Sequence, residues 1–231
     1  MARQTAIAHN LANAETPGFR ADLAQARSVW VKGNTNDTRI VPSESASAAD
    51  MRAGTVAHTG RPLDIALNGD SMLAVQAPDG TEAYTRRGDL QISASGVLTT
   101  GDGYPVIGGQ GPITITNADS VSIDAQGRIS IVPIGGDAKQ AQSVDQIKIV
   151  SPAGQTITKA ESGLFITPGG TLPDDPDARI QSGALEGSNV VATEALVSMI
   201  EASRSWDNQI KLLTSARELD SSTADLMKIP E

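Results

Sequence analysis

The chain contains no cysteine and few aromatic residues. Without cysteine it forms no disulfide, carries no thiolate nucleophile and offers no cysteine-ligated metal site. Aromatic residues make up only 3% of its 231 residues, so small and aliphatic side chains must build the interior. A chain of this length is long enough to bury a substantial core, in one large domain or two small ones.

Basic residues are also scarce, with 18 Lys and Arg against 27 Asp and Glu. No run of Lys and Arg is present to neutralise closely spaced phosphates, so we expect no nucleic-acid partner. No apolar stretch approaches the ~20 residues of a membrane span, so we expect no membrane insertion. Residues 1–16 include His9, Asn10, Asn13 and Glu15 in place of an apolar core, which indicates no cleaved signal peptide.

The strongest periodic pattern lies near the C-terminus, where residues 189–229 read as one long helix that Ser188 or Asn189 is placed to cap. Its apolar seam advances in steps of three and four, like the a and d positions of a coiled coil. A seam of this kind packs on its own domain or against other subunits. The length of the helix favours packing against the N-terminal helix and neighbouring subunits. The seam consists of Leu196, Met199, Ser203, Trp206, Ile210 and Leu213.

A second helical pattern covers residues 2–14, where Ile7 and Leu11 lie four apart on one face. No capping residue precedes this pattern, so we expect the helix to begin upstream of Met1. Proline cannot continue a helix and glycine permits a turn, so residues 16–18 should end it. Residues 1–20 therefore read as a helix and its exit turn.

The middle of the chain is rich in short apolar runs bounded by Gly, Asn and Pro. Residues 21–54 are expected to form an extended linker region, with a short strand near 28–31 and a mobile segment at 43–49. Residues 55–180 are expected to form an all-β domain of about ten strands, folded as a roll or barrel. Residues 181–231 hold the C-terminal helix. The predicted fold is thus mainly β, with terminal α-helices that pair like a coiled coil.

Several residues suggest chemistry, but none lies in a complete motif. Asp64 has no carboxylate or histidine placed beside it by spacing, and His9 and His58 lack the spacing of metal ligands. The acidic segment 174–177 lacks the glycine and distal glutamate of a calcium loop. The glycine-rich segment 101–111 lacks the Lys-Ser/Thr of a phosphate loop, so it reads as β-turns. We therefore predict no catalytic residue, no cofactor and no metal.

Four blocks, in order along nearly the whole chain, resemble the flagellar axial proteins of the rod and hook. They are Asn10–Arg20, Thr59–Gly69, Tyr84–Gly108 and Arg179–Val190. In the C-terminal helix Trp206-Asp207 departs from the Phe or Tyr followed by Glu that is usual in this family. The positions that match the family motifs are Asn10, Leu11, Asn13, Thr16, Gly18, Phe19, Pro62, Leu63, Asp64, Gly183, Leu185, Glu186, Ser188, Asn189 and Val190.

This resemblance implies a structural subunit and not an enzyme. Such proteins leave the cytoplasm through the flagellar export apparatus and stack helically in the periplasm-spanning rod of the basal body. The terminal helices form an inner tube, and the β domain lies outside it. The partners implied are other rod proteins and copies of the chain itself.

The length and short middle domain are most similar to the proximal-rod members of the family. A distal-rod or hook-type axial protein is the alternative, and a ligand-binding or enzymatic β protein with a helical appendage is a more remote one. Phe19 either enters a groove of a neighbouring subunit or packs within its own chain. The residues expected to join subunits are Leu11, Phe19, Leu196, Met199, Trp206, Ile210 and Leu213.

Overall fold

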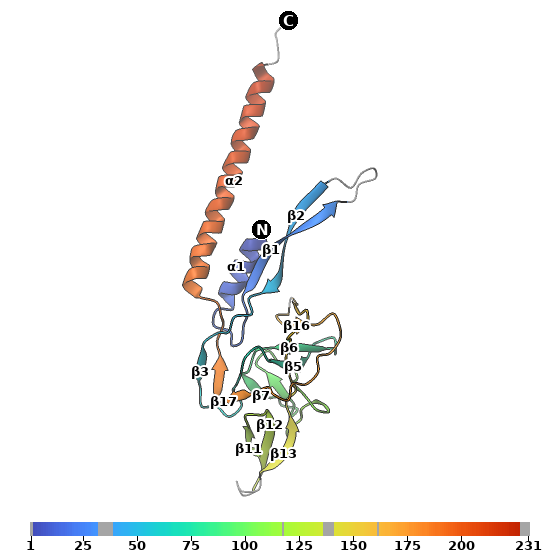
Figure 1. Ribbon diagram of the computed structural model, residues 1–231. Coiled ribbons are helices and arrows are strands. Elements are labelled where there is room, and N and C mark those ends of the chain that lie inside the picture. The colour runs from blue at the N-terminus through green and yellow to red at the C-terminus, as the bar shows by residue number, and fades with distance from the viewer. Residues whose placement is uncertain (1, 32–38, 117, 136–140, 161, 227–231) are drawn as a thin grey trace.

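The computed structural model describes residues 2–31, 39–116, 118–135, 141–160 and 162–226. These residues form two regions, which we call the head and the stalk (Figure 1). The head comprises residues 56–186 and is built from strands. The stalk comprises helix α1 (Ala2–Ala12), the hairpin of β1 (Asp22–Val31) and β2 (Arg39–Ala49), and helix α2 (Ala192–Leu226).

The two stalk helices are very unequal in length. At 1.5 Å per residue α1 is about 16 Å long and α2 about 52 Å. Helix α1 runs antiparallel to α2 beside its first turns, where Ala6 is buried, and the rest of α2 projects alone (Figure 1). The helices therefore pair only at the base of α2, and a coiled coil is not confirmed. The predicted helix end at Ile229 lies outside the described residues.

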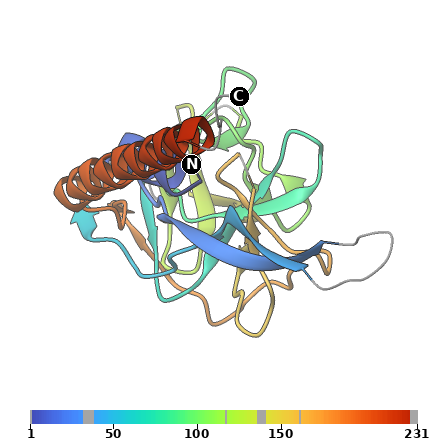
Figure 2. The ribbon, with the colours of Figure 1, turned by 90° about the horizontal axis from the view of Figure 1, so that it is seen from above.

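The hairpin corrects the expectation of a linker over residues 43–49. Strands β1 and β2 pair antiparallel from Asp22↔Ala49 to Val31↔Arg39. Within the stalk, the hairpin points away from α2 at an angle (Figure 2). The segment is small and polar, which favours a loop in isolation, but a neighbouring strand satisfies its backbone hydrogen bonds. Composition alone does not reveal such a partner.

The paired strands of the head are all antiparallel, and the largest sheet has the order β14-β5-β6-β16-β15. A three-stranded sheet, β11-β12-β13, forms the end of the head opposite the stalk (Figure 1). The strands are β3 (Val56–His58), β4 (Ile65–Leu67), β5 (Met72–Gln76), β6 (Glu82–Thr85), β7 (Leu90–Ile92), β8 (Leu98–Thr100), β9 (Ile107–Gly108), β10 (Gly111–Pro112), β11 (Ala118–Ile123), β12 (Arg128–Pro133), β13 (Gln142–Gln146), β14 (Ile149–Val150), β15 (Thr158–Lys159), β16 (Phe165–Ile166), β17 (Ile180–Ser182) and β18 (Ala184–Glu186).

Strand β5 lies between two separate hydrophobic clusters. Successive side chains of a strand point to opposite faces of the sheet. Accordingly Leu73 and Val75 belong to the larger cluster, whereas Met72 and Ala74 belong to a smaller one with Tyr84. All four apolar residues of β5 are fully buried. The five-stranded sheet is therefore covered on both faces and forms the rigid centre of the head.

The expected roll or barrel is not closed. Among the described residues the head strands form separate small sheets, linked by isolated bridges such as Val75↔Val106 and Val150↔Asp174. Many strands are only two or three residues long. The apolar runs correctly marked most of these strands, but a run shows only that a strand is half-buried. It does not show which strand is its neighbour.

The chain passes between stalk and head at one place. Strand β3 leads into the head and β18 leads out, and the two are paired from Val56↔Glu186 to His58↔Ala184. On the stalk side of this ladder the Gly187 N–H donates to the Thr55 carbonyl at 2.8 Å. The two crossing segments are thus bonded side by side. We call this region, where the stalk contacts the head, the joint.

Candidate assembly surfaces and the joint between stalk and head

The predicted seam of α2 faces solvent over most of its length. At 100° per residue its five large apolar members fall within about 100° of the helix circumference. Leu213 is 61% exposed, Leu196 47%, Ile210 46% and Trp206 38%. Met199, near α1, is half-buried. A contiguous apolar stripe in water is typical of a surface that another protein covers.

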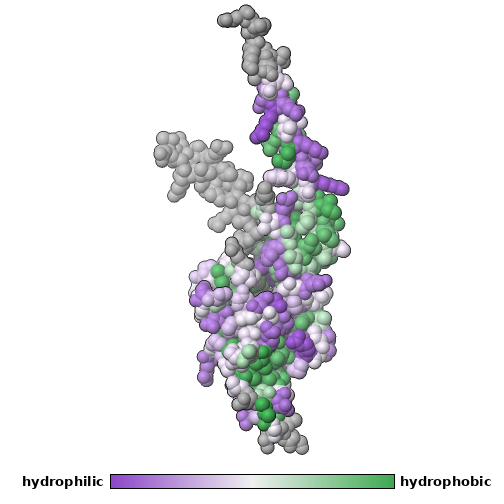
Figure 3. Space-filling model, turned by 180° about the vertical axis from the view of Figure 1, so that it is seen from behind, coloured by the Kyte–Doolittle hydropathy of each residue, from purple (hydrophilic) through white to green (hydrophobic). Residues whose placement is uncertain are grey.

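A second apolar surface lies at the base of α2. Val197 and Ile200 are turned by roughly 90–150° from the middle of the seam, and each is more than half exposed. Val191, just before the helix, is equally exposed. The view from behind shows this apolar surface over the first turns of α2 (Figure 3). The sequence analysis missed it, because a heptad pattern counts only one stripe.

The turn after α1 is held by two asparagine side chains. Asn10 accepts a hydrogen bond from the Asp22 N–H at 2.7 Å and donates to the Asp22 carbonyl at 3.0 Å. It therefore pairs with β1 as a neighbouring strand would. Asn13 donates to the His9 carbonyl at 2.9 Å and accepts from the Thr16 hydroxyl at 3.1 Å. These motif residues fix the direction in which the chain leaves α1.

Gly18 touches the head at a distance that no other residue allows. Its φ is +67°, in the left-handed region that glycine adopts freely. A Cβ at this position would lie 2.3 Å from the Arg86 carbonyl oxygen. The Gly18 N–H donates to the Glu186 carbonyl at 2.7 Å. The exit turn is thus seated directly on the head, which explains Gly18 in the motif.

Phe19 packs within its own chain. Its ring meets His9 edge-on at 5.4 Å between centroids, and Lys159 Nζ lies 3.9 Å from the ring centre. Lys159 also donates to the Arg20 carbonyl at 2.7 Å and to Asp22 Oδ1 at 2.6 Å. Burial lowers the pKa of Lys159, and the hydrogen bond and charge of Asp22 oppose this. A contact of Phe19 or Leu11 with another subunit stays a prediction.

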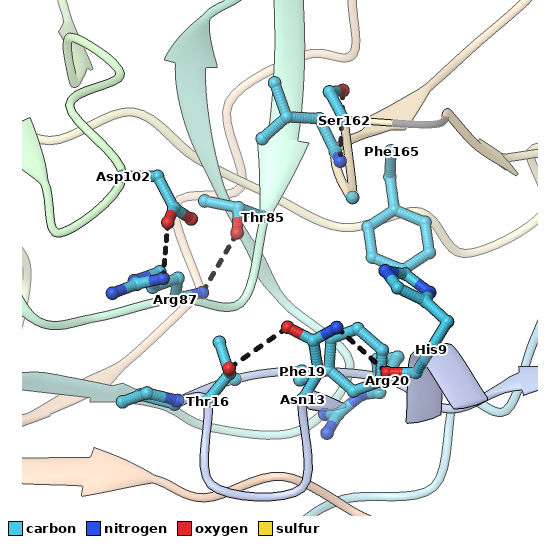
Figure 4. Close-up of a pocket in the computed structure, with 14 residues that line it drawn as sticks. His9, Asn13, Thr16, Phe19, Arg20, Thr85, Arg87, Asp102, Ser162 and Phe165 are labelled. Atoms are coloured by element: carbon cyan, nitrogen blue, oxygen red, sulfur yellow. Dashed lines mark hydrogen bonds and ion pairs between the residues drawn. The ribbon is translucent and has the colours of Figure 1, made fainter. Parts of the chain in front are cut away.

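A cleft separates this turn from the head (Figure 4). His9, Asn13 and Phe19 line one side, and Arg87 and Phe165 belong to the other. The side chains that line it already have partners: Arg87 forms an ion pair with Asp102 at 2.6 Å, and the His9 ring nitrogen contacts Asp22. The cleft therefore reads as part of the joint between stalk and head.

Asn189 ties three segments together before α2 begins. Its side-chain oxygen accepts from the Ala21 N–H at 2.8 Å, and its nitrogen donates to the carbonyls of Asp50 and Arg52 at 2.8 and 2.9 Å. The Ser188 hydroxyl accepts from the Val190 N–H at 3.1 Å. The helix starts at Ala192, so neither residue caps it: Asn189 binds neighbouring segments instead, and Ser188 makes a local bond to Val190.

The motif around Asp64 forms one rim of the head. Asp64 is buried, accepts from the Thr59 hydroxyl at 2.7 Å and receives the Gly183 N–H on its backbone carbonyl at 2.7 Å. Leu63 packs against the larger hydrophobic cluster, whereas Pro62 is exposed. These bonds hold the β3–β4 connection against the β17–β18 turn, which is a structural arrangement.

Glu186 lies at the centre of the joint. Its side chain is 2% exposed, like those of Arg20 and Arg86. Arg20 Nη2 donates to Glu186 Oε1 at 2.7 Å, and the Gly54 N–H donates to the same oxygen at 2.8 Å. Arg86 donates to Oε2 through Nε at 2.9 Å and through Nη2. We call these three side chains the buried triad.

The electrostatics of the buried triad keep the carboxylate charged. Burial alone would raise the pKa of Glu186, but the hydrogen bonds and charges of Arg86 and Arg20 outweigh it and hold that pKa below its ordinary value. Burial lowers the pKa of Arg86, and the Glu186 carboxylate offsets part of this effect. The sequence analysis missed both arginines, because they lie 166 and 100 residues from Glu186.

Leu185, the motif residue next to Glu186, is half-buried. Among the residues that the structure describes, no group of three or more His, Cys, Asp or Glu side chains is placed to bind a metal ion. Within the same residues, no helix combines the length and the apolar character that crossing a bilayer requires.

Two parts of the chain match known protein families. Residues 66–131 match the family described as flagellar hook protein FlgE/F/G D1 domain. Residues 181–226 match the family described as flagellar basal body rod FlgEFG protein C-terminal. The first match falls within the head, and the second covers β18, the segment that leads from it to α2, and the described part of α2.

Similar curated proteins extend over nearly the whole chain. The flagellar basal-body rod protein FlgF of Salmonella typhimurium is 41% identical over 234 residues, 98% of this chain and 93% of its own length. FlgF of Escherichia coli K12 is 41% identical over 92% of this chain and 87% of its own length. FlgG of Bacillus subtilis is 33% identical over 92% of this chain and 89% of its own length. The chain therefore belongs to the FlgF family of flagellar basal-body rod proteins.

Proposed function

We propose that the chain is a structural subunit of the proximal rod of the flagellar basal body, and that it assembles helically through its terminal helices. The observation that carries this proposal is the exposed seam of α2, from Trp206 to Leu213, which lies beyond the reach of α1. The similar FlgF proteins are named as basal-body rod proteins, which supports the same function.

Helices of neighbouring subunits are the occupants that fit this seam. The seam has near-heptad spacing, so a second helix covers it by coiled-coil-like packing. Each Leu-sized side chain that becomes buried stabilises the assembly by roughly 1.5–3 kcal/mol. Part of this gain offsets the loss of freedom when subunits associate. The projecting part of α2 is consequently ordered in the rod and frays in the free subunit.

The remaining features of the proposal follow from the family. The partners are other rod proteins and copies of the same chain, the location is the periplasm-spanning rod, and export proceeds through the flagellar export apparatus without a cleaved signal. We propose no enzymatic activity. The names of the similar proteins, which are basal-body rod proteins, support this part of the proposal.

The test is complementation of a strain that lacks the gene. The wild-type chain, Leu213→Asp and the control Ser205→Asp are expressed, and purified basal bodies are imaged by electron microscopy. Ser205 is exposed on the same helix but lies away from the seam. We expect rods with the wild type and with Ser205→Asp, and none with Leu213→Asp. Complete rods in the deletion strain would contradict the proposal.

The same images separate proximal from distal placement. A distal-rod protein is the alternative, and the chain is also similar to FlgG of Bacillus subtilis, which is likewise named as a basal-body rod protein. A deletion strain without any rod supports the proximal assignment, whereas a rod of partial length assigns the chain to a distal position.

A further inference from the structure

The buried triad joins segments that belong to different regions of the molecule. Arg20 is on the exit turn of the stalk, Arg86 follows β6 in the head, and Glu186 ends β18 at the junction. Gly54, on the segment that enters the head, is bonded to the same carboxylate. One carboxylate therefore contacts the stalk, the head and both crossing segments.

Arg86 is fixed firmly to the head. Its Nη1 donates to the carbonyls of Gly69 and Ser71 at 2.7 and 2.6 Å, and its Nη2 donates to the Leu67 carbonyl at 2.9 Å. These carbonyls lie at the end of β4 and in the loop before β5. Arg86 thus presents a guanidinium with little freedom to move, and Glu186 is held against a rigid support.

Arg20 is attached in the opposite way. Its side chain is equally buried, yet within the described residues Nε and Nη1 have no hydrogen-bond partner, and Nη2 bonds only to Glu186. The position of this guanidinium therefore depends on the one carboxylate. A buried charge that loses its partner is strongly unfavourable, so the exit turn stays where Arg20 reaches Glu186.

We propose that Glu186 fixes the angle between stalk and head, acting as a positioning residue that clamps Arg20 of the stalk to Arg86 of the head. Arg20 lies outside residues 56–186, so a substitution at Arg20 removes no side chain of the head. The angle is a property of the free chain, whereas its importance for the rod rests on the proposed function.

The absence of cysteine makes the angle directly measurable. Spin labels on Ala8→Cys in α1 and Ser143→Cys in β13 report the stalk-to-head distance by pulsed electron paramagnetic resonance. Labels on Ser143→Cys and Ala153→Cys report distances inside the head. All three side chains are exposed. The wild type should give a narrow distribution for both pairs.

Arg20→Met and Glu186→Gln are the test variants, and Arg87→Met is the matched control. Arg87 adjoins Arg86 and is also ion-paired, but its partners Asp89 and Asp102 both lie in the head. We expect Arg20→Met and Glu186→Gln to broaden the stalk-to-head distribution at least twofold, with the head pair unchanged. Arg87→Met should leave the stalk-to-head distribution narrow. Glu186→Gln leaves two buried arginines without a counter-charge. Arg20→Met removes the coupling but keeps the Glu186–Arg86 pair, so it serves where Glu186→Gln fails to fold.

Two results would overturn the inference. The first is a narrow, unshifted stalk-to-head distribution in Arg20→Met with an intact head, which would mean that the other contacts across the joint, such as those of Lys159 and Gly18, set the angle. The second is normal rods in cells that carry the broadened Arg20→Met chain, which would remove the role in assembly. Neither result depends on the seam of α2, so the proposed function and this inference fail separately.

Discussion

The head and the stalk bury their apolar side chains to very different extents. In the head, residues such as Leu73, Leu90 and Leu98 are fully enclosed by the two hydrophobic clusters. In the stalk, Leu212, Leu213 and Leu219 are each more than 60% exposed. The head is thus complete as a folding unit, whereas the stalk carries apolar surface that its own chain does not cover.

This difference teaches how one chain divides folding from assembly. The head gains its stability from side chains that meet within the molecule, so it is stable before any partner arrives. The stalk leaves large apolar residues exposed, as a surface that associates with other molecules does. Under the proposed function, the same type of side chain, leucine, serves stability in one region and association in the other.

The sharpest test makes one change in both regions. Leu98→Ala in the head should lower the free energy of unfolding by about 2–5 kcal/mol, because it leaves a cavity in the core. Leu213→Ala in the stalk should change the free energy of unfolding of the free subunit by at most about 0.5 kcal/mol. Urea denaturation followed by circular dichroism measures both. Equal losses would erase the distinction between the two regions.

The contact between the regions depends on Gly18. Gly18→Ala adds a Cβ 2.3 Å from the Arg86 carbonyl at a positive φ, and should cost roughly 2–4 kcal/mol. The matched control is Gly60→Ala, which has a similar φ of +73° but no atom within 4 Å of the added Cβ. It should cost only about 1–2 kcal/mol. Thermal denaturation of both variants would show whether the close approach matters; identical melting shifts would argue against it.

Alkaline pH should weaken the head through Tyr84. Its hydroxyl accepts the Leu172 N–H at 2.6 Å and donates to Glu82 at 2.9 Å. Burial raises its pKa from 10.0 to about 12. Because the folded pKa is the higher one, the stabilisation is complete below pH 10 and is lost as pH rises through 12. The loss is on the order of 3 kcal/mol.

Tyr84→Phe is the control for this pH dependence. Phenylalanine has no proton to lose, so the stability difference between wild type and variant should shrink as pH rises from 9 to 12. Urea midpoints at each pH give this difference. A constant difference across the range would show that Tyr84 is not responsible.

The smallest effect is expected at the rim of the head. Thr59→Val removes the hydrogen bond to the buried Asp64 carboxylate and should cost about 1–3 kcal/mol. Thr81→Val removes a bond of similar length to Asp79, which is exposed to water, and should change stability little. Chemical denaturation compares the pair. A loss with Thr81→Val as large as that with Thr59→Val would mean that burial of the carboxylate is unimportant.

Local patterns predicted the elements of this fold better than their contacts. The seam of α2, the turn at residues 16–18 and most head strands follow from periodicity and from turn residues, which act over a few positions. The strand over residues 43–49 did not, because it depends on backbone hydrogen bonds to its partner strand β1. The buried triad did not either, because its two arginines lie 166 and 100 residues from Glu186 and no local pattern connects them.

The second apolar surface at Val197 and Ile200 was missed for a related reason. A helix can present more than one apolar face, and which face stays exposed depends on where α1 packs. The motif residues, by contrast, could be named from the sequence, but their contacts could not. Asn189, read as a helix cap, instead binds the segments that cross the joint.

The ladder of β3 and β18 has a mechanical consequence. A head attached through one strand would swivel about that strand, since a single covalent tether resists stretching but not rotation. Here two tethers run side by side and are bonded to each other from Val56↔Glu186 to His58↔Ala184. Two bonded tethers resist twisting of the head about the direction in which they run, whereas bending across them is what the proposed clamp of the buried triad opposes. A twisting load on the stalk therefore reaches the head as torque, which a rotating shaft must transmit.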